Sequence, residues 1–250
     1  MTVHFMQNVN AQNSTYINAP QLWSEADFSG KFTQKLFYQF DLQYARQGSS
    51  TEINLFKYNS QLTIRPWLHY FIKPTLRLSG FAGLWYNYGI LDVGQREYPE
   101  WRTAQQVTFY SPKNKFTLSN RLRIEERFIK DRTGNFESVL RFRYQIKCVA
   151  PIAKHTPEIK GASYLVGFDE FFINGGSTVT GHSLFDQNRI FIGYGYYLTD
   201  NLILETGYFN QFQLESNDRF FDVNHVWQIT FYINNAFNKK IKNTTPDSSD

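Results

Sequence analysis

The chain has 250 residues, of which 42% are hydrophobic and 19% charged, and its formal net charge is +4. It contains no run of roughly 18 apolar residues, which excludes a bundle of transmembrane helices. Its 16 Tyr, 24 Phe and 5 Trp supply too much apolar area for a disordered chain. The single cysteine, Cys148, excludes an intrachain disulfide and a cysteine-based zinc site. The mild charge, without a basic run, indicates no nucleic-acid partner.

The two ends of the chain differ in composition from the middle. The segment 1–12 contains Val9-Asn10-Ala11, which is typical of the cleavage site of a secretory signal. We therefore expect 1–12 to be the remnant of an export signal or a flexible tail. The segment 239–250 is polar and rich in turn residues, which predicts a loose C-terminal tail. No internal repeat or linker divides the rest, so we expect 13–238 to form one domain.

The middle of the chain shows period-two patterning, which predicts strands. In 118–128, for example, Leu122 and Ile124 lie on one face and Arg123 lies on the other. Short and long connections alternate between the segments, which indicates an up-and-down meander. The expected strands are, in chain order, 21–29, 35–46, 53–66, 74–88, 100–111, 118–128, 136–148, 161–174, 187–199, 201–215 and 223–237.

These eleven segments are an odd number, whereas bacterial single-chain barrels have an even number of strands. Either 13–20 adds a strand and makes twelve, or 21–29 is not a strand and ten remain. We favour twelve. The fold class that we expect is thus all-β, an antiparallel up-and-down barrel of about twelve strands, with ten as the other count.

The size of this barrel predicts which face is inside. About eight strands make a barrel whose interior can just be filled by side chains, so a wider barrel with an apolar interior would contain a void or a large apolar ligand. A polar interior can instead hold water and paired charges. We expect a transmembrane barrel with its apolar face outside; the alternative is a soluble barrel or sandwich with an apolar core, in which a barrel of this width would bind an apolar ligand.

Charged residues recur on the face that we assign to the interior, and opposite charges on adjacent strands can pair across the ladder. Flanking arginines would keep carboxylates such as Asp41 and Glu125 ionised, which favours a lattice of ion pairs over acid–base catalysis. The candidate lattice residues are Lys35, Asp41, Arg121, Arg123, Glu125, Arg127, Glu137, Arg141 and Arg143.

Aromatic residues near the expected strand ends are typical of the membrane–water boundary, where the ring is dry and the polar tip is wet. We assign His69 to this boundary as an interface residue. The aromatic residues that we assign to it are Trp23, Trp67, Tyr70, Phe71, Trp85, Tyr86, Tyr88, Trp101, Phe109, Tyr110, Tyr196, Tyr197 and Trp227. The last strand alternates apolar residues and closes on Phe237, which is similar to the C-terminal assembly signal of outer-membrane barrels.

Several segments share a distinctive order and spacing over about 22–238. They are Glu100-Trp101-Arg102-Thr103-Ala104-Gln105-Gln106, Asn120-Arg121-Leu122-Arg123-Ile124-Glu125-Glu126-Arg127-Phe128, Arg141-Phe142-Arg143, Asp169-Glu170-Phe171-Phe172-Ile173-Asn174 and Asp186-Gln187-Asn188-Arg189. Together they resemble the uncharacterised DUF2490 family. The resemblance implies an outer-membrane barrel of the kind predicted in Bacteroidota, and it implies no activity.

No motif for catalysis or metal binding stands out. Gly181-His182-Ser183 invites comparison with an outer-membrane lipid hydrolase, but adjacent residues on an extended chain point to opposite sides. The histidines have no metal-ligand spacing. We expect no enzyme activity, metal or cofactor, and a place in the outer membrane of a Gram-negative bacterium. The expected role is a membrane scaffold or a narrow solute pore, with a lipid-acting hydrolase as the alternative. The expected partners are outer-membrane lipids, the outer-membrane assembly machinery and small anionic solutes.

Overall fold

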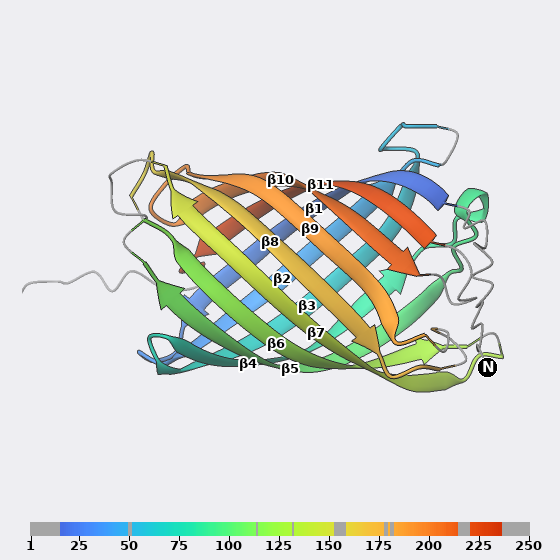
Figure 1. The fold of residues 1–250 in the computed structure, drawn as a ribbon, viewed down its shortest axis with the longest axis horizontal. Helices are drawn as coiled ribbons and strands as arrows, with labels where there is room; N and C mark the ends of the chain where they lie inside the picture. The colour runs from blue at the N-terminus through green and yellow to red at the C-terminus, as the bar shows by residue number, and fades with distance from the viewer. Residues whose placement is uncertain are drawn as a thin grey trace, which may run out of the picture.

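A computed structural model of the chain shows a closed β-barrel (Figure 1). The structure describes residues 16–49, 52–113, 115–131, 133–152, 159–177, 180, 183–214 and 221–236. The expected signal remnant (1–12), the polar tail (239–250), Phe237 and His182 therefore lie outside the described residues. The strands are β1 (Tyr16–Lys31), β2 (Leu36–Gln47), β3 (Tyr58–Lys73), β4 (Leu76–Asn87), β5 (Tyr98–Pro112), β6 (Thr117–Lys130), β7 (Phe136–Pro151), β8 (Ser163–Asn174), β9 (Phe185–Tyr197), β10 (Leu202–Leu214) and β11 (Phe221–Asn234), with one short 3-10 helix, η1 (Leu91–Val93).

Each of the eleven expected segments forms a strand, and consecutive strands pair antiparallel around the barrel. The expected even total differs from the structure, because the residues from Tyr16 continue into 21–29 as one strand and not as two. With an odd number of strands the first and last must run in the same direction. β1 and β11 accordingly pair in parallel along Tyr16–Ser29 and close the barrel.

The boundaries agree well except in β3, which we expected at 53–66. The chain at 52–57 forms a loop, because the side chain of Asn54 accepts the backbone N–H of Phe56 at 3.0 Å and its carbonyl accepts that of Lys57 at 3.1 Å. The strand then runs through Pro66 to Lys73. The longer connections after β2, β4 and β8 leave one end of the barrel, which carries η1 at the right of Figure 1. We call this the long-loop end; the connection after β7, over 152–162, is an exception and leaves the opposite end.

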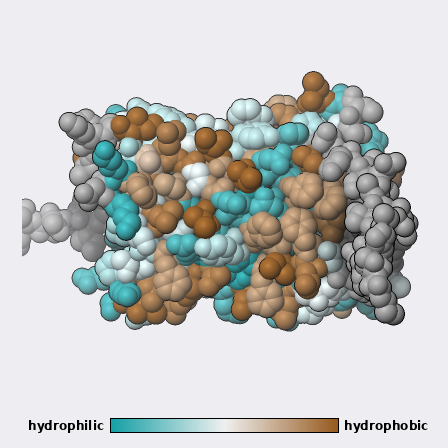
Figure 2. All heavy atoms as spheres, viewed as in Figure 1, coloured by the Kyte–Doolittle hydropathy of each residue, from teal (hydrophilic) through white to brown (hydrophobic). Residues whose placement is uncertain are grey.

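The outer surface of the barrel is largely apolar. Figure 2 shows apolar side chains over much of one face, with polar residues between them. Asp169 on β8 is an exposed polar residue and accepts a hydrogen bond from Asn188 Nδ2 at 2.6 Å. The exposed large apolar residues come from nearly every strand and include Phe40, Leu68, Leu78, Trp101, Leu122, Phe142, Phe171, Ile192 and Trp227.

The part of the chain that the structure describes holds no helix long and apolar enough to cross a membrane.

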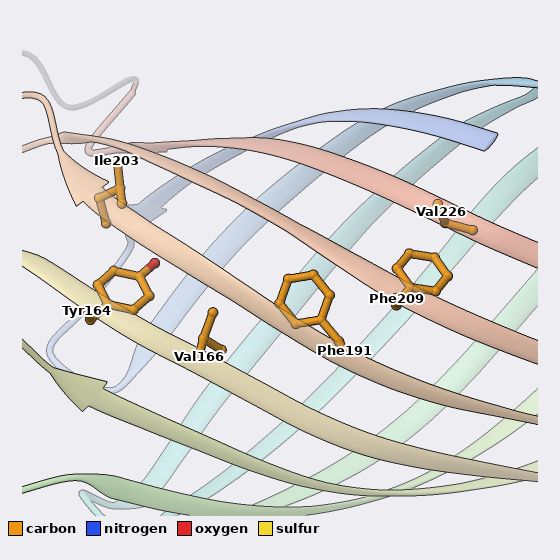
Figure 3. Packing of buried hydrophobic residues seen from close by; sticks show 6 residues of the cluster. All are labelled: Tyr164, Val166, Phe191, Ile203, Phe209 and Val226. Carbon is orange, nitrogen blue, oxygen red and sulfur yellow. The ribbon is translucent and has the colours of Figure 1, made fainter. Parts of the chain in front are cut away.

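One sector of the interior, along β8 to β11, is filled by apolar side chains (Figure 3). Glycines on the same strands make room for the rings. A Cβ at Gly195 would lie 2.0 Å from the ring of Tyr164, and one at Gly207 would lie 2.4 Å from the ring of Phe191. The residues of this sector are Tyr164, Val166, Phe191, Ile203, Phe209 and Val226.

Candidate functional site in the barrel interior

The centre of the charged interior is Glu125, which is fully buried on β6. Its carboxylate pairs with Arg123 at 3.0 Å on the same strand, and with Arg141 at 2.6 Å and Arg143 at 2.5 Å on β7. Arg123 and Arg143 face each other directly across the two strands. Like charges in this position repel, so the carboxylate between them holds the pair together.

A second carboxylate holds a second pair of facing arginines, on β5 and β6, nearer the long-loop end. Arg102 on β5 and Arg127 on β6 are directly opposite each other. Both donate hydrogen bonds to the buried Glu100, Arg102 Nε at 2.6 Å and Arg127 Nε at 2.5 Å. Each guanidinium uses two nitrogens on the carboxylate, which is the strong bidentate geometry of arginine–carboxylate pairs.

A further carboxylate, Glu170 on β8, extends the network. It pairs with Arg121 and, at 2.8 Å, with Arg143. Since Arg143 also binds Glu125, the ion pairs form a continuous chain across three strands. Sequence alternation alone did not decide whether Asp169 or Glu170 faces the interior; Glu170 is 2% exposed and Asp169 lies outside.

The opposite wall, on β1 to β3, reverses the charges. Asp27 and Asp41 are directly opposite each other, and Arg65 on β3 pairs with Asp41 at 3.3 Å and with Glu25. Gln39 donates hydrogen bonds to Asp41 at 2.6 Å and to Asp27 at 3.3 Å. Carboxylate oxygens of Glu25, Asp27 and Asp41 lie within 4.8 Å of one another, but Arg65 already pairs with two of them, Glu25 and Asp41.

Aromatic rings pack beside several of the interior arginines. The guanidinium of Arg102 lies 4.1 Å from the ring centre of Trp85, and that of Arg143 lies 4.2 Å from the ring centre of Phe172. Such stacking stabilises a cation without neutralising it. Trp67 serves Arg123 in the same way at 5.0 Å and also donates its Nε1–H to Asp41 at 2.8 Å.

The prediction that Trp67, Trp85 and His69 lie at an outer boundary is therefore wrong: all three are buried inside the barrel. His69 lies between Ser79 at 2.8 Å and Gln39 at 3.1 Å and stacks on Trp67. Aromatic rings pack beside the interior arginines, and the sequence pattern does not distinguish such rings from aromatic residues at the membrane–water boundary. Trp23 also packs inside, against Phe209 with ring centres 4.9 Å apart, whereas Trp101 and Trp227 do face outward.

The structure places most of the candidate lattice residues inside. Asp41, Arg123, Glu125, Arg127 and Arg141 are buried, while Arg121 and Arg143 are partly buried in the same network. Glu137 is half-buried on the inward face of β7, near the long-loop end.

The prediction that Lys35 belongs to the interior lattice is wrong, because Lys35 is exposed in the turn between β1 and β2. The hydroxyl of Thr33 accepts the backbone N–H groups of Lys35 and Leu36, at 3.2 and 3.0 Å. This capping keeps Lys35 in the turn, and the strand begins only at Leu36.

Sequence reasoning missed several lattice members. Glu100 and Arg102 alternate with outward residues and could have been found by the same test as Arg123. Asp186 could not. The pairing of β8 and β9 shifts at Phe172/Ile173, which leaves Asp186 without a cross-strand partner in the register. This bulge turns Asp186 inward beside Gln187, where it pairs with Arg141 at 3.2 Å.

The lattice and the apolar sector leave a polar cavity of about 230 Å³ inside the barrel. Seven arginine and lysine side chains but only four carboxylates line it. This arrangement can brace the wall against collapse, block the lumen, or hold a small anion.

These features define a class: a closed β-barrel with a charged, ion-paired interior and an apolar exterior. The chain belongs to the DUF2490 family, described as proteins of unknown function, whose family model matches residues 20–222. No curated protein and no solved structure matches the chain.

Proposed function

We propose that the chain spans the outer membrane of a Gram-negative bacterium as a closed barrel and acts as a scaffold, without catalytic activity or a cofactor of its own. The observation that carries this proposal is the inverted polarity. Leu122 and Trp101 are each 53% exposed, whereas Glu100 and Glu125 are fully buried. Soluble proteins rarely expose large apolar side chains on so many strands, while a membrane barrel needs an apolar outer band. Its partners would then be outer-membrane lipids and the outer-membrane assembly machinery.

The density of ion pairs favours a blocked lumen over an open one. Glu125, Glu170 and Glu100 each bind at least two arginines, and aromatic rings pack beside these arginines. A barrel filled in this way holds its loops at the surface and conducts little. The second candidate function is a narrow pore for small anionic solutes. The excess of cations around the cavity favours it, since rings of Arg or Lys side chains are expected in anion-selective pores.

Membrane insertion is tested by fractionating cells that express the protein and running the detergent extract on a gel, heated and unheated. A membrane barrel should come from the outer-membrane fraction and migrate faster unheated. Recovery in the soluble fraction, with no heat-dependent shift, would contradict the proposal.

Planar-bilayer recording separates the scaffold from the pore. The scaffold predicts a silent bilayer across a range of salts and voltages, with insertion verified by protease protection. Steady anion-selective steps would replace the scaffold with the pore.

A further inference from the structure

Three cations on the cavity wall are the starting point for a binding site. Arg77 on β4, Arg121 on β6 and Lys147 on β7 all line the polar cavity. Arg77, Thr108 and Arg121 form one row of directly paired residues across β4, β5 and β6. Two strand spacings, about 10 Å, separate the ends of this row, so both long side chains can reach one small ligand. We call Arg77, Arg121 and Lys147 the basic wall.

Most of the charge on this wall is not neutralised by protein. Among the residues that the structure describes, Arg77 and Lys147 have no carboxylate oxygen within 4 Å, while Arg121 pairs with Glu170. The Nε atoms of Arg77 and Arg121 are buried and find no hydrogen-bond acceptor among the described residues. An orphaned buried donor is costly, and such groups usually have a partner, whether protein, water or ion.

The position of Arg77 is fixed by rings and not by charge. Its guanidinium lies 5.7 Å from the ring centre of Phe71 and 5.5 Å from that of Tyr110, and these two rings are stacked on each other at 6.4 Å. The aromatic contacts orient the guanidinium and leave its charge available. Arg121 is oriented in turn by Glu170.

We propose that the basic wall binds a small oxyanion of the phosphate class inside the lumen. Guanidinium groups match the oxygens of such an ion through paired N–H donors, and the lysine adds a point charge. The cavity of about 230 Å³ accommodates a phosphate together with several waters, because a water occupies about 30 Å³. This site goes beyond the scaffold role, and it depends on the geometry of the lumen and not on membrane insertion.

The test is titration of the detergent-purified full chain with inorganic phosphate at constant ionic strength set by chloride. Binding is followed by calorimetry and by the temperature at which the folded gel band is lost. We expect phosphate to bind the wild type and to raise this temperature above its value in chloride. Arg77→Gln and Lys147→Gln should each weaken binding by about tenfold, and neither residue belongs to the ion-pair lattice.

The matched control is Lys113→Gln, a lysine exposed in the turn after β5, which should bind like the wild type. No response of the wild type to phosphate would overturn the site, and so would equal losses in Lys113→Gln and Arg77→Gln. Since the titration needs only folded protein, it fails or succeeds separately from the fractionation test of the membrane proposal.

Discussion

At the scale of single residues, the interior is organised by carboxylates that each serve more than one arginine. Glu125 holds Arg123, Arg141 and Arg143. Removing one partner of a buried charge network is more costly than the network's net contribution to stability, because the remaining charges are left uncompensated.

We therefore expect Glu125→Gln to destabilise the barrel by about 3–5 kcal/mol. The gel temperature at which the folded band disappears, or the urea midpoint, measures this effect. The control is Glu126→Gln on the outer face, where Glu126 accepts a hydrogen bond from Ser138 at 3.0 Å; we expect a change within about 0.5 kcal/mol. Equal effects of the two substitutions would show that the lattice does not stabilise the barrel.

A second residue-scale feature lies in the long loops, where Asp92 of η1 accepts hydrogen bonds from Tyr58 and, at 3.2 Å, from Lys57. The Tyr58 hydroxyl, and then the Lys57 ammonium, lower the pKa of Asp92 below its usual value. A carboxylate with a lowered pKa stabilises the folded loop above its ordinary pKa, and this contribution is lost as the pH falls through the lowered one.

The amide of Gly94 donates to the carbonyl of Leu91 at 3.1 Å. As the pH is lowered, this amide should stay protected from exchange through the ordinary Asp pKa of about 3.9. Its exchange rate should rise only at lower pH. Asp92→Asn should abolish this step. A step at the ordinary value would show that the contact between the two loops does not form.

At the scale of elements, alternation predicted the strands and the inward faces of β2, β6 and β7, because the period of two is a property of the extended chain itself. It could not predict the bulge that turns Asp186 inward, since a bulge depends on the pairing with β8. It also could not place Trp67, because β-strands carry aromatics on both faces. Alternation therefore identified the lattice residues on β6 and β7, and the same test could have added Glu100 and Arg102 on β5, whereas Asp186 required the register between strands.

The parallel seam between β1 and β11 is the element that departs most from an even-numbered barrel. Ser24 is the direct partner of Ile229, and both lie on the outer face. In a Cys148→Ser background, the double substitution Ser24→Cys and Ile229→Cys should form a disulfide under mild oxidation. Non-reducing electrophoresis after cleavage between the two sites detects the bond.

Ser24→Cys with Ile233→Cys is the matched control. Four further residues displace the second position by about 13 Å along the strand, which is beyond the reach of a disulfide. A bond in the control, or none in the first pair of a folded barrel, would mean that the seam closes in another register or with another strand.

At the scale of the whole molecule, the distribution of polarity makes a quantitative prediction about the surroundings of the barrel. Leu122 faces outward near mid-strand of β6. If lipid surrounds it, Leu122→Arg should cost about 2–4 kcal/mol and reduce insertion into liposomes. Leu91, in η1, is 98% exposed, and Leu91→Arg should insert like the wild type. Equal insertion of both variants would indicate water on the outer face.

The parallel seam also limits how the fold can be rearranged. Because β1 and β11 run in the same direction, the start of the first strand and the end of the last lie at opposite mouths of the barrel. A linker joining them would have to run the length of β11, whose 14 residues span about 45 Å. Circular permutation, which short linkers allow in even-stranded barrels, would here require a long connection through the occupied lumen or across the apolar wall.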